Sequence, residues 1–188
     1  MQLSRDHIGT LLNGRTRRTL PVGANRKACV LVPLLFHDGA LNLLLTKRTD
    51  DVEHHKGQIS FPGGMVDEGD RSDIDTALRE TEEEIGIPRS AIVTLGLLDD
   101  IHIPTGFIVT PVVGYIDCSP EVHTNPGEVA EVLVIPFHKF FDPALHRTEE
   151  RLLRGAMRSI HIYTVWKEPV WGATAHIIHE FTTLLASP

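Results

Sequence analysis

Three glutamates share one face of a predicted helix. Residues 72–85 carry apolar side chains at helical spacing, and Gly86 follows them, which is typical of a helix and its C-terminal end. Glu80, Glu83 and Glu84 stand at positions i, i+3 and i+4, so their carboxylates share one side. This crowding near the negative end of the helix dipole is unfavourable. Mg²⁺ or Mn²⁺ would relieve it, so the pattern predicts a metal site; a solvated acidic surface is the alternative.

The residues around these glutamates strengthen the prediction of a ligand site. Arg79 lies four residues before Glu83 and can pair with it, which would orient that carboxylate. Gly63 and Gly64 end a short predicted strand, and an acidic loop leads from them to the helix. Paired glycines let the backbone turn tightly and approach a ligand closely. Strand, glycine turn, acidic loop and acidic helix therefore belong to one predicted site.

The elements that must position this site form a mixed α/β (α+β) pattern. Residues 1–25 are interpreted as a leader arm that packs over a main domain at 26–188. A hairpin is expected where the turn signal His-Asp-Gly-Ala at 37–40 separates two apolar runs. The order of elements predicts a mixed β-sheet sandwiched between helices. The expected helices span 6–12, 72–85 and 172–185, and the expected strands span 28–36, 41–46, 58–61, 93–97, 107–116, 129–135 and 159–166.

Composition and charge exclude several classes of function. The chain has 188 residues and a net charge of −7, without a basic stripe, so it is a poor candidate for binding nucleic acid. Its longest apolar run, residues 28–36, is far shorter than the roughly 20 residues that span a membrane. The two cysteines, Cys29 and Cys118, lack metal-ligand spacing and favour a reducing, cytoplasmic location. Apart from His54 and His55, the 11 histidines show no ligand spacing, so structural or surface roles are expected for them.

Residues 79–87, Arg-Glu-Thr-Glu-Glu-Glu-Ile-Gly-Ile, resemble the second half of the Nudix box, R-E-U-x-E-E-x-G-U, where U is apolar. Thr81 stands at one aliphatic position. The first half of the box departs from the usual form, because 14 residues separate Gly64 from Arg79, one more than usual. The resemblance implies a Nudix fold and a metal-dependent diphosphatase.

This spacing, one residue longer than usual, resembles that of one branch of the Nudix hydrolases, the coenzyme A pyrophosphatases. That branch has a D-x-x-D pair, which corresponds here to Asp67 and Asp70, and an upstream signature L-L-T-x-R-[SA]-x3-R-x3-G-x3-F-P-G-G. Residues 44–49 read Leu-Leu-Thr-Lys-Arg-Thr, Gly57 follows, and residues 61–64 read Phe-Pro-Gly-Gly. Glu53 replaces the second arginine of the signature, so an anion stands where a cation would suit the 3′-phosphate of coenzyme A.

The resemblance implies hydrolysis of coenzyme A to 4′-phosphopantetheine and adenosine 3′,5′-bisphosphate with Mg²⁺ or Mn²⁺. Glu80 and Glu84 are expected to be the leading metal ligands, and the Gly63 carbonyl an additional one. Glu83 is expected to be a further ligand or the general base, and Arg79 to orient a carboxylate. Glu128, outside the box, is another candidate for the base; a solvated acid at a strand edge is the alternative interpretation.

Substrate contacts are expected from a second group of residues. Arg48 ends a strand near the glycines and can meet a phosphate or form a surface salt bridge. The other expected contacts are Gly64 and, in place of the missing arginine, His54, His55 and Lys56. Two rival functions stay open: a Nudix hydrolase for another nucleotide, such as ADP-ribose or a dinucleotide, and a Nudix module that binds without turnover. The expected partner is a small molecule, not a nucleic acid or a membrane, and a homodimer is possible.

Overall fold

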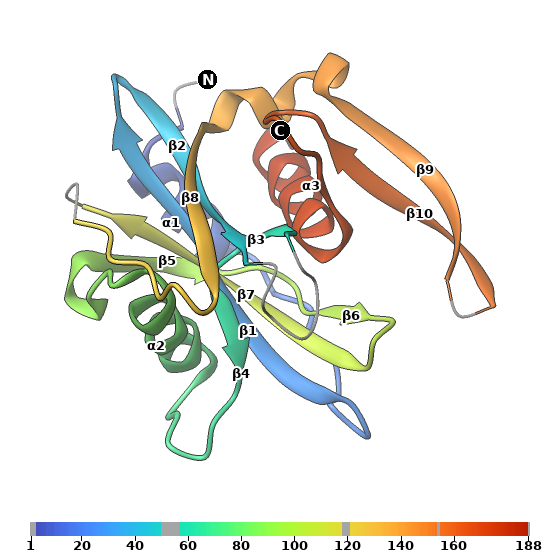
Figure 1. The fold of residues 1–188 in the computed structure, drawn as a ribbon, viewed down its shortest axis with the longest axis horizontal. Helices are drawn as coiled ribbons and strands as arrows, with labels where there is room; N and C mark the ends of the chain where they lie inside the picture. The colour runs from blue at the N-terminus through green and yellow to red at the C-terminus, as the bar shows by residue number, and fades with distance from the viewer. Residues whose placement is uncertain (1–2, 50–56, 118–120, 154, 188) are drawn as a thin grey trace.

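The computed structural model describes residues 3–49, 57–117, 121–153 and 155–187 (Figure 1). Eight strands form a mixed main sheet with the order β3-β2-β1-β7-β5; β4 pairs with β1, β6 with β7 and β8 with β2. These strands are β1 (Arg26–His37), β2 (Ala40–Arg48), β3 (Ile59–Ser60), β4 (Gly63–Met65), β5 (Ile92–Leu97), β6 (Ile101–Ile103), β7 (Phe107–Ile116) and β8 (Val129–Pro136).

The remaining elements lie around this sheet. A second sheet of three strands has the order β11-β10-β9. None of the helices in the described ranges is long and apolar enough to cross a membrane. The strands of the second sheet are β9 (His146–Leu153), β10 (Ala156–Tyr163) and β11 (Val170–Trp171), and the helices are α1 (Arg5–Gly14), α2 (Asp73–Ile85) and α3 (Gly172–Ala186), with short 3-10 turns at η1 (Arg89–Ala91), η2 (Phe137–Phe141) and η3 (Pro143–Leu145).

Helices cover both faces of the main sheet, which confirms the predicted architecture. Along β1, the alternation of side chains sends Leu31 and Leu35 into a core beneath α2. Val32 and Leu34 enter a second core, which α1 and α3 share. The strand β1 is central because it pairs in parallel with β7 over residues 26–35 and 107–116, and antiparallel with β2 and β4.

The helix α2 carries local signals at both ends. The Ser72 hydroxyl accepts a hydrogen bond from the Asp75 backbone N–H at 3.1 Å, and Gly86 ends the helix in the left-handed region at φ 71°. Thr81, which replaces an aliphatic residue of the Nudix box, is fully buried. Its hydroxyl donates to the Ala77 carbonyl at 2.7 Å, so the buried hydroxyl finds its hydrogen-bond partner within the same helix.

The structure corrects several sequence-based expectations. Gly63 and Gly64 do not form a turn; they lie in β4 and pair with Val30 and Cys29 of β1. The expected strand at 159–166 is β10, which begins and ends three residues earlier. Its partner β9 was missed because its Arg- and Glu-rich residues are mostly solvent-exposed, so no apolar alternation marks it. β4, β6 and β11 were missed too, because two or three residues are too few to show a period.

Cys29 is a buried free thiol beneath α2. Burial, and secondarily the nearby Asp73 carboxylate, raises the pKa of this thiol to about 12. It is therefore protonated and unreactive at neutral pH. Cys118 lies outside the described residues.

The segment interpreted as a leader arm packs on the main sheet through a buried carboxylate. Asp100 is 2% exposed. It accepts hydrogen bonds from the Arg17 guanidinium at 3.0 Å, the Leu20 backbone N–H at 2.9 Å and the Thr110 hydroxyl at 2.7 Å. Nearby, Ile8 of α1 is fully buried in the core. The arm thus contributes both apolar contacts and a cation to the domain.

Replacing Asp100 by Ala should lower the free energy of unfolding by about 3 kcal/mol, because Arg17 then loses its buried partner. Asp117→Ala is the matched control, since it removes an ion pair with Arg5 in which both side chains are exposed. We expect that control to change stability by less than about 1 kcal/mol. Urea unfolding measures both variants, and equal effects would contradict a central role for Asp100.

Candidate active site

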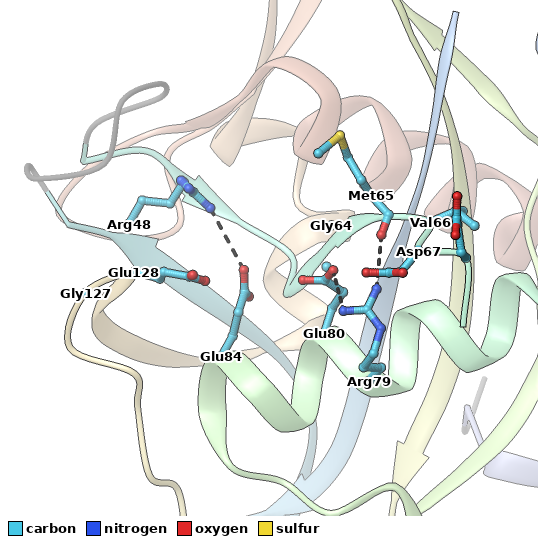
Figure 2. Close-up of a pocket in the computed structure, with 12 residues that line it drawn as sticks. Arg48, Gly64, Met65, Val66, Asp67, Arg79, Glu80, Glu84, Gly127 and Glu128 are labelled. Atoms are coloured by element: carbon cyan, nitrogen blue, oxygen red, sulfur yellow. Dashed lines mark hydrogen bonds and ion pairs between the residues drawn. The ribbon is translucent and has the colours of Figure 1, made fainter. Parts of the chain in front are cut away.

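A cavity of about 820 Å³ opens where α2 faces β4 and the start of β8 (Figure 2). It brings together the ends of segments that are distant in the sequence. Its lining contains most of the predicted site residues and is rich in carboxylates. The residues that line it are Arg48, Gly63, Gly64, Met65, Val66, Asp67, Glu68, Arg79, Glu80, Glu84, Gly127 and Glu128.

Gly64 lets α2 approach β4 closely, and Gly63 lets β4 lie close to β1. A Cβ atom at Gly64 would lie 2.5 Å from the Glu80 carboxyl carbon, so any side chain there would displace Glu80. At Gly63, with φ 152°, a Cβ atom would collide with the Cys29 carbonyl oxygen and the Val30 Cα atom. Glycine is required at both positions by close packing. The glycines thereby leave space for the Glu80 carboxylate.

Glu84 is the most deeply buried carboxylate of the cavity, with 4% exposure. Its Oε2 atom is buried and has no hydrogen-bond partner among the described residues. Its Oε1 atom lies 3.9 Å from an Nη atom of Arg48, which is an ion pair at the long limit (Figure 2). Burial raises the pKa of Glu84 to about 8; Arg48 opposes the shift, whereas the charges of Glu128 and Glu80 add to it. Its charge is therefore incompletely compensated by the residues that the structure describes.

Glu80 lies one helical turn before Glu84 and faces the same cavity (Figure 2). Burial is the largest cause that raises the pKa of Glu80, and the charges of Glu83 and Glu128 act in the same direction. The Arg79 guanidinium, 2.9 Å from Glu80 Oε1, partly offsets these effects. The cavity therefore concentrates negative charge at low solvent exposure, the condition in which a counter-cation is most stabilising.

Arg79 links α2 to the acidic loop that precedes it. Its guanidinium donates two hydrogen bonds to Asp70, at 2.8 and 2.9 Å, and one to the Met65 carbonyl at 3.1 Å. The two Arg79 hydrogen bonds hold the pKa of the Asp70 carboxyl well below the usual range, although burial of Asp70 acts in the opposite direction. Asp70 was not among the predicted site residues, although the D-x-x-D pair was a signal that could have identified it.

Glu83 is the predicted site residue that the structure separates from the cavity. Its side chain is 57% exposed and pairs with Arg79 at 3.0 Å, on the outer side of the helix. It does not belong to the residues that line the cavity. Its expected role as metal ligand or general base stays a prediction.

Glu128 enters the cavity from the loop before β8 (Figure 2). The Thr49 backbone N–H donates to the Glu128 carbonyl at 3.0 Å, and the Thr49 hydroxyl donates to the Gly127 carbonyl at 3.2 Å. The end of β2 therefore fixes this loop and also carries Arg48, whose Nε is buried without a hydrogen-bond partner in the described ranges. The proposed contacts His54, His55 and Lys56, like Glu53, lie outside the described residues.

Five further cavity residues were missed by the sequence-based prediction. Asp67 and Glu68 were already part of the acidic loop, and their charge was a usable signal. Met65, Val66 and Gly127 have no chemical signal of their own, and only the path of the backbone places them there.

The oxygen ligands of the cavity fit a hard divalent cation. Glu80 and Glu84 present carboxylates from one helix face, and Glu128 faces them from the loop before β8. The buried, unpartnered Oε2 of Glu84 is the observation that supports this fit most directly, because a buried anionic oxygen without a donor is strongly unfavourable. The set contains no thiolate or imidazole, which favours Mg²⁺ or Mn²⁺ over softer metals.

Comparisons with known proteins agree with this geometry. Residues 25–155 match the family model described as the NUDIX domain. The chain is 43% identical to a protein of Pectobacterium atrosepticum named "Uncharacterized Nudix hydrolase NudL" over 162 residues, which cover 85% of this chain and 83% of that protein. The protein of the same name from Photorhabdus laumondii is 37% identical over 156 residues, covering 83% of each chain.

Solved structures share the fold. A MutT/nudix family protein from Enterococcus faecalis aligns with a TM-score of 0.55 over 97% of this chain and 70% of that chain, at 19% identity. A MutT NUDIX hydrolase from Burkholderia pseudomallei aligns with a TM-score of 0.51 over 82% of this chain and 96% of that chain, at 20% identity. The chain therefore belongs to the Nudix hydrolase family, whose enzymes act on nucleoside diphosphate derivatives.

Proposed function

We propose that this enzyme hydrolyses the pyrophosphate bond of coenzyme A or its derivatives, giving 4′-phosphopantetheine and adenosine 3′,5′-bisphosphate. The observation that carries the diphosphatase chemistry is the buried carboxylate of Glu84, unpartnered at Oε2, beside Glu80. The choice of coenzyme A rests on the sequence signature at residues 44–64 and on the D-x-x-D pair. A cytoplasmic location and a homodimer stay predictions.

In this proposal, Glu80 and Glu84 hold Mg²⁺ or Mn²⁺, with Glu83, Glu128 and the Gly63 carbonyl as candidates for further ligands. When bound, such a cation neutralises phosphate charge and lowers the pKa of a bound water. Arg79 keeps the Glu80 carboxylate oriented through their 2.9 Å contact.

Residues at the edge of the cavity are proposed to remove the proton from water and to bind the phosphate. Glu128 is the better placed candidate for the general base, because it lines the cavity whereas Glu83 is exposed outside it. A base of this kind removes a proton from the attacking water. Arg48, with its guanidinium beside Glu84, is positioned to meet a phosphate oxygen. Gly64 stays a predicted substrate contact; the Glu80 carboxylate occupies the space that its side chain would fill.

A second candidate substrate class is another nucleoside diphosphate derivative, such as ADP-ribose or a dinucleotide. The observation that favours it is Glu53, an anion where the signature of the coenzyme A branch has arginine. His54, His55 and Lys56 are the cations that we propose in its place. A binding module without turnover is disfavoured, because Glu80, Glu83 and Glu84 are all retained.

The test of the proposed substrate compares coenzyme A, ADP-ribose and NADH with Mg²⁺ and with Mn²⁺, using mass spectrometry to identify the products. We expect coenzyme A to yield 4′-phosphopantetheine and adenosine 3′,5′-bisphosphate with the highest kcat/KM. Cleavage of ADP-ribose or NADH with coenzyme A left intact would assign the enzyme to the second substrate class.

Glu84→Gln should lower kcat by at least about 100-fold, because an amide cannot replace the charge of a metal-binding carboxylate. Glu82→Gln is the matched control on the same helix; Glu82 is exposed, pairs with Arg89 and does not line the cavity. That control should keep wild-type turnover. Normal activity in Glu84→Gln would contradict its assignment as a ligand.

In metal-free protein, the stability difference between wild type and this variant should depend on pH. Since the pKa of Glu84 is raised from 4.5 to about 8, the stability linked to its protonated form is full below pH 4.5 and is lost as the pH rises through 8. Urea unfolding in EDTA should therefore find Glu84→Gln more stable than wild type by up to about 5 kcal/mol at pH 9, and the difference should shrink towards pH 4.5. An advantage that does not vary with pH would show that burial of the charge is not its cause.

Gly64→Ala should reduce turnover by at least about 100-fold, because the new Cβ atom displaces the Glu80 carboxylate. Stability should change little, since a flexible side chain end can move away. Gly69→Ala in the same loop is the control, because nothing lies within 4 Å of its Cβ position. Steady-state kinetics and thermal unfolding measure both variants; equal turnover in the two would contradict the close contact of Gly64 and Glu80.

A further inference from the structure

Three histidines come together at the base of the β9–β10 hairpin, apart from the residues of the cavity. His146 lies in β9, His161 in β10 and His179 in α3. None of them lines the cavity described above. Figure 1 shows β9, β10 and α3 as neighbours, on the part of the molecule where the chain ends. Their positions in the sequence gave no metal-ligand spacing, because the cluster forms only when the hairpin meets the helix.

The hairpin register explains why two of these side chains meet. His146 stands opposite Tyr163, and His161 lies two residues before Tyr163 on the same strand. Side chains two residues apart share a face of a strand, so both imidazoles project to the same side. That side faces α3, where His179 completes the cluster.

The distances within the cluster suit a shared metal ion. One ring nitrogen from each histidine can be chosen so that all three lie within 4.8 Å of one another. His146 Nε2 and His161 Nδ1 are 3.0 Å apart. Two nitrogens bound at about 2.0–2.1 Å to one tetrahedral zinc ion are separated by about 3.4 Å, so these atoms need only small shifts.

Burial favours the neutral form of two of the three imidazoles, His146 and His161. Desolvation lowers the pKa of His161 to about 4, with His179, His146 and His176 adding to the effect, and desolvation also lowers the pKa of His146. Both imidazoles are therefore neutral at pH 7, and a neutral imidazole offers a lone pair to a metal.

We propose that His146, His161 and His179 form a second metal site, which binds a borderline transition metal of the Zn²⁺ class and fastens the β9–β10 hairpin to α3. Three imidazoles without a carboxylate suit Zn²⁺, Co²⁺ or Ni²⁺ and not Mg²⁺ or Mn²⁺. The site is therefore chemically distinct from the carboxylate cavity. Three protein ligands leave a fourth position for water.

The imidazole rings of the cluster are stacked and must reorient to bind one metal ion. The centroids of His161 and His179 are 3.9 Å apart, with the ring planes 19° from parallel. Lone pairs lie in the ring planes, so stacked rings do not aim them at one point. Binding requires at least one ring to turn about its Cβ–Cγ bond, a torsion that is broad in histidine. Metal binding should therefore change the ring stacking.

The experiment titrates the full chain with Co²⁺ at pH 7.5 in a large excess of Mg²⁺, which occupies the carboxylate cavity. Visible absorption of bound Co²⁺ reports nitrogen ligands, and competition with Zn²⁺ gives the affinity for zinc. We expect one Co²⁺ per chain and a loss of affinity of at least about 100-fold in His179→Gln and in His146→Gln. His138→Gln is the matched control, because His138 is an exposed histidine in η2 outside the cluster.

Two controls keep the outcomes separate. Diphosphate hydrolysis with Mg²⁺ should be unchanged in both cluster variants, which shows that they fold and that the two sites are independent. ¹⁵N NMR of the wild-type histidine rings should show the shifts of three ring nitrogens on adding Zn²⁺, a result that needs no variant. Absence of saturable Co²⁺ binding by the wild type, or binding that survives in both cluster variants, would overturn the proposal.

Discussion

The candidate site depends on the close contact between the Glu80 carboxylate of α2 and Gly64 of β4. Glu80 occupies the space that a Cβ atom would fill at Gly64, and Glu84 is buried one turn further along. Both carboxylates are thus removed from water before any ligand is present, which favours their protonated forms. A larger side chain at Gly64 would occupy the space of the Glu80 carboxylate and displace it from this position.

Cations of the protein balance only part of this charge. Arg79 donates to both oxygens of Asp70 and to the Met65 carbonyl, so it connects the acidic loop to the helix, and it reaches Glu80 with one nitrogen. Arg48 lies 3.9 Å from Glu84, too far for a strong hydrogen bond. The arrangement favours binding of a further cation over neutralisation by the protein's own side chains, which is consistent with the proposed metal-dependent hydrolysis.

The helix α2 could be predicted from the sequence because its signals are local: Ser72 at the start, Gly86 at the end and a regular apolar stripe between them. The shared face of Glu80 and Glu84 followed from helix geometry alone. The exposure of Glu83 could not be predicted, because it depends on which side of the stripe β4 and β8 occupy. Similarly, the contact of Gly64 with Glu80 and that of His146 with His179 join segments that are distant in the sequence. The periodicity of a single sequence does not reveal such contacts.

The parallel pairing of β1 with β7 has a consequence for synthesis of the protein on the ribosome. The centre of the sheet can form only after residues 107–116 have been synthesised, because they pair with residues 26–35. In the same way, β2 can pair with β8 only after residues 129–136 have been synthesised. At roughly 5–20 residues per second, β1 spends several seconds as a nascent apolar segment without its neighbour. Pairing between such distant segments slows folding. During that interval β1 is the segment most exposed to aggregation and the natural target of chaperones that bind extended apolar chains.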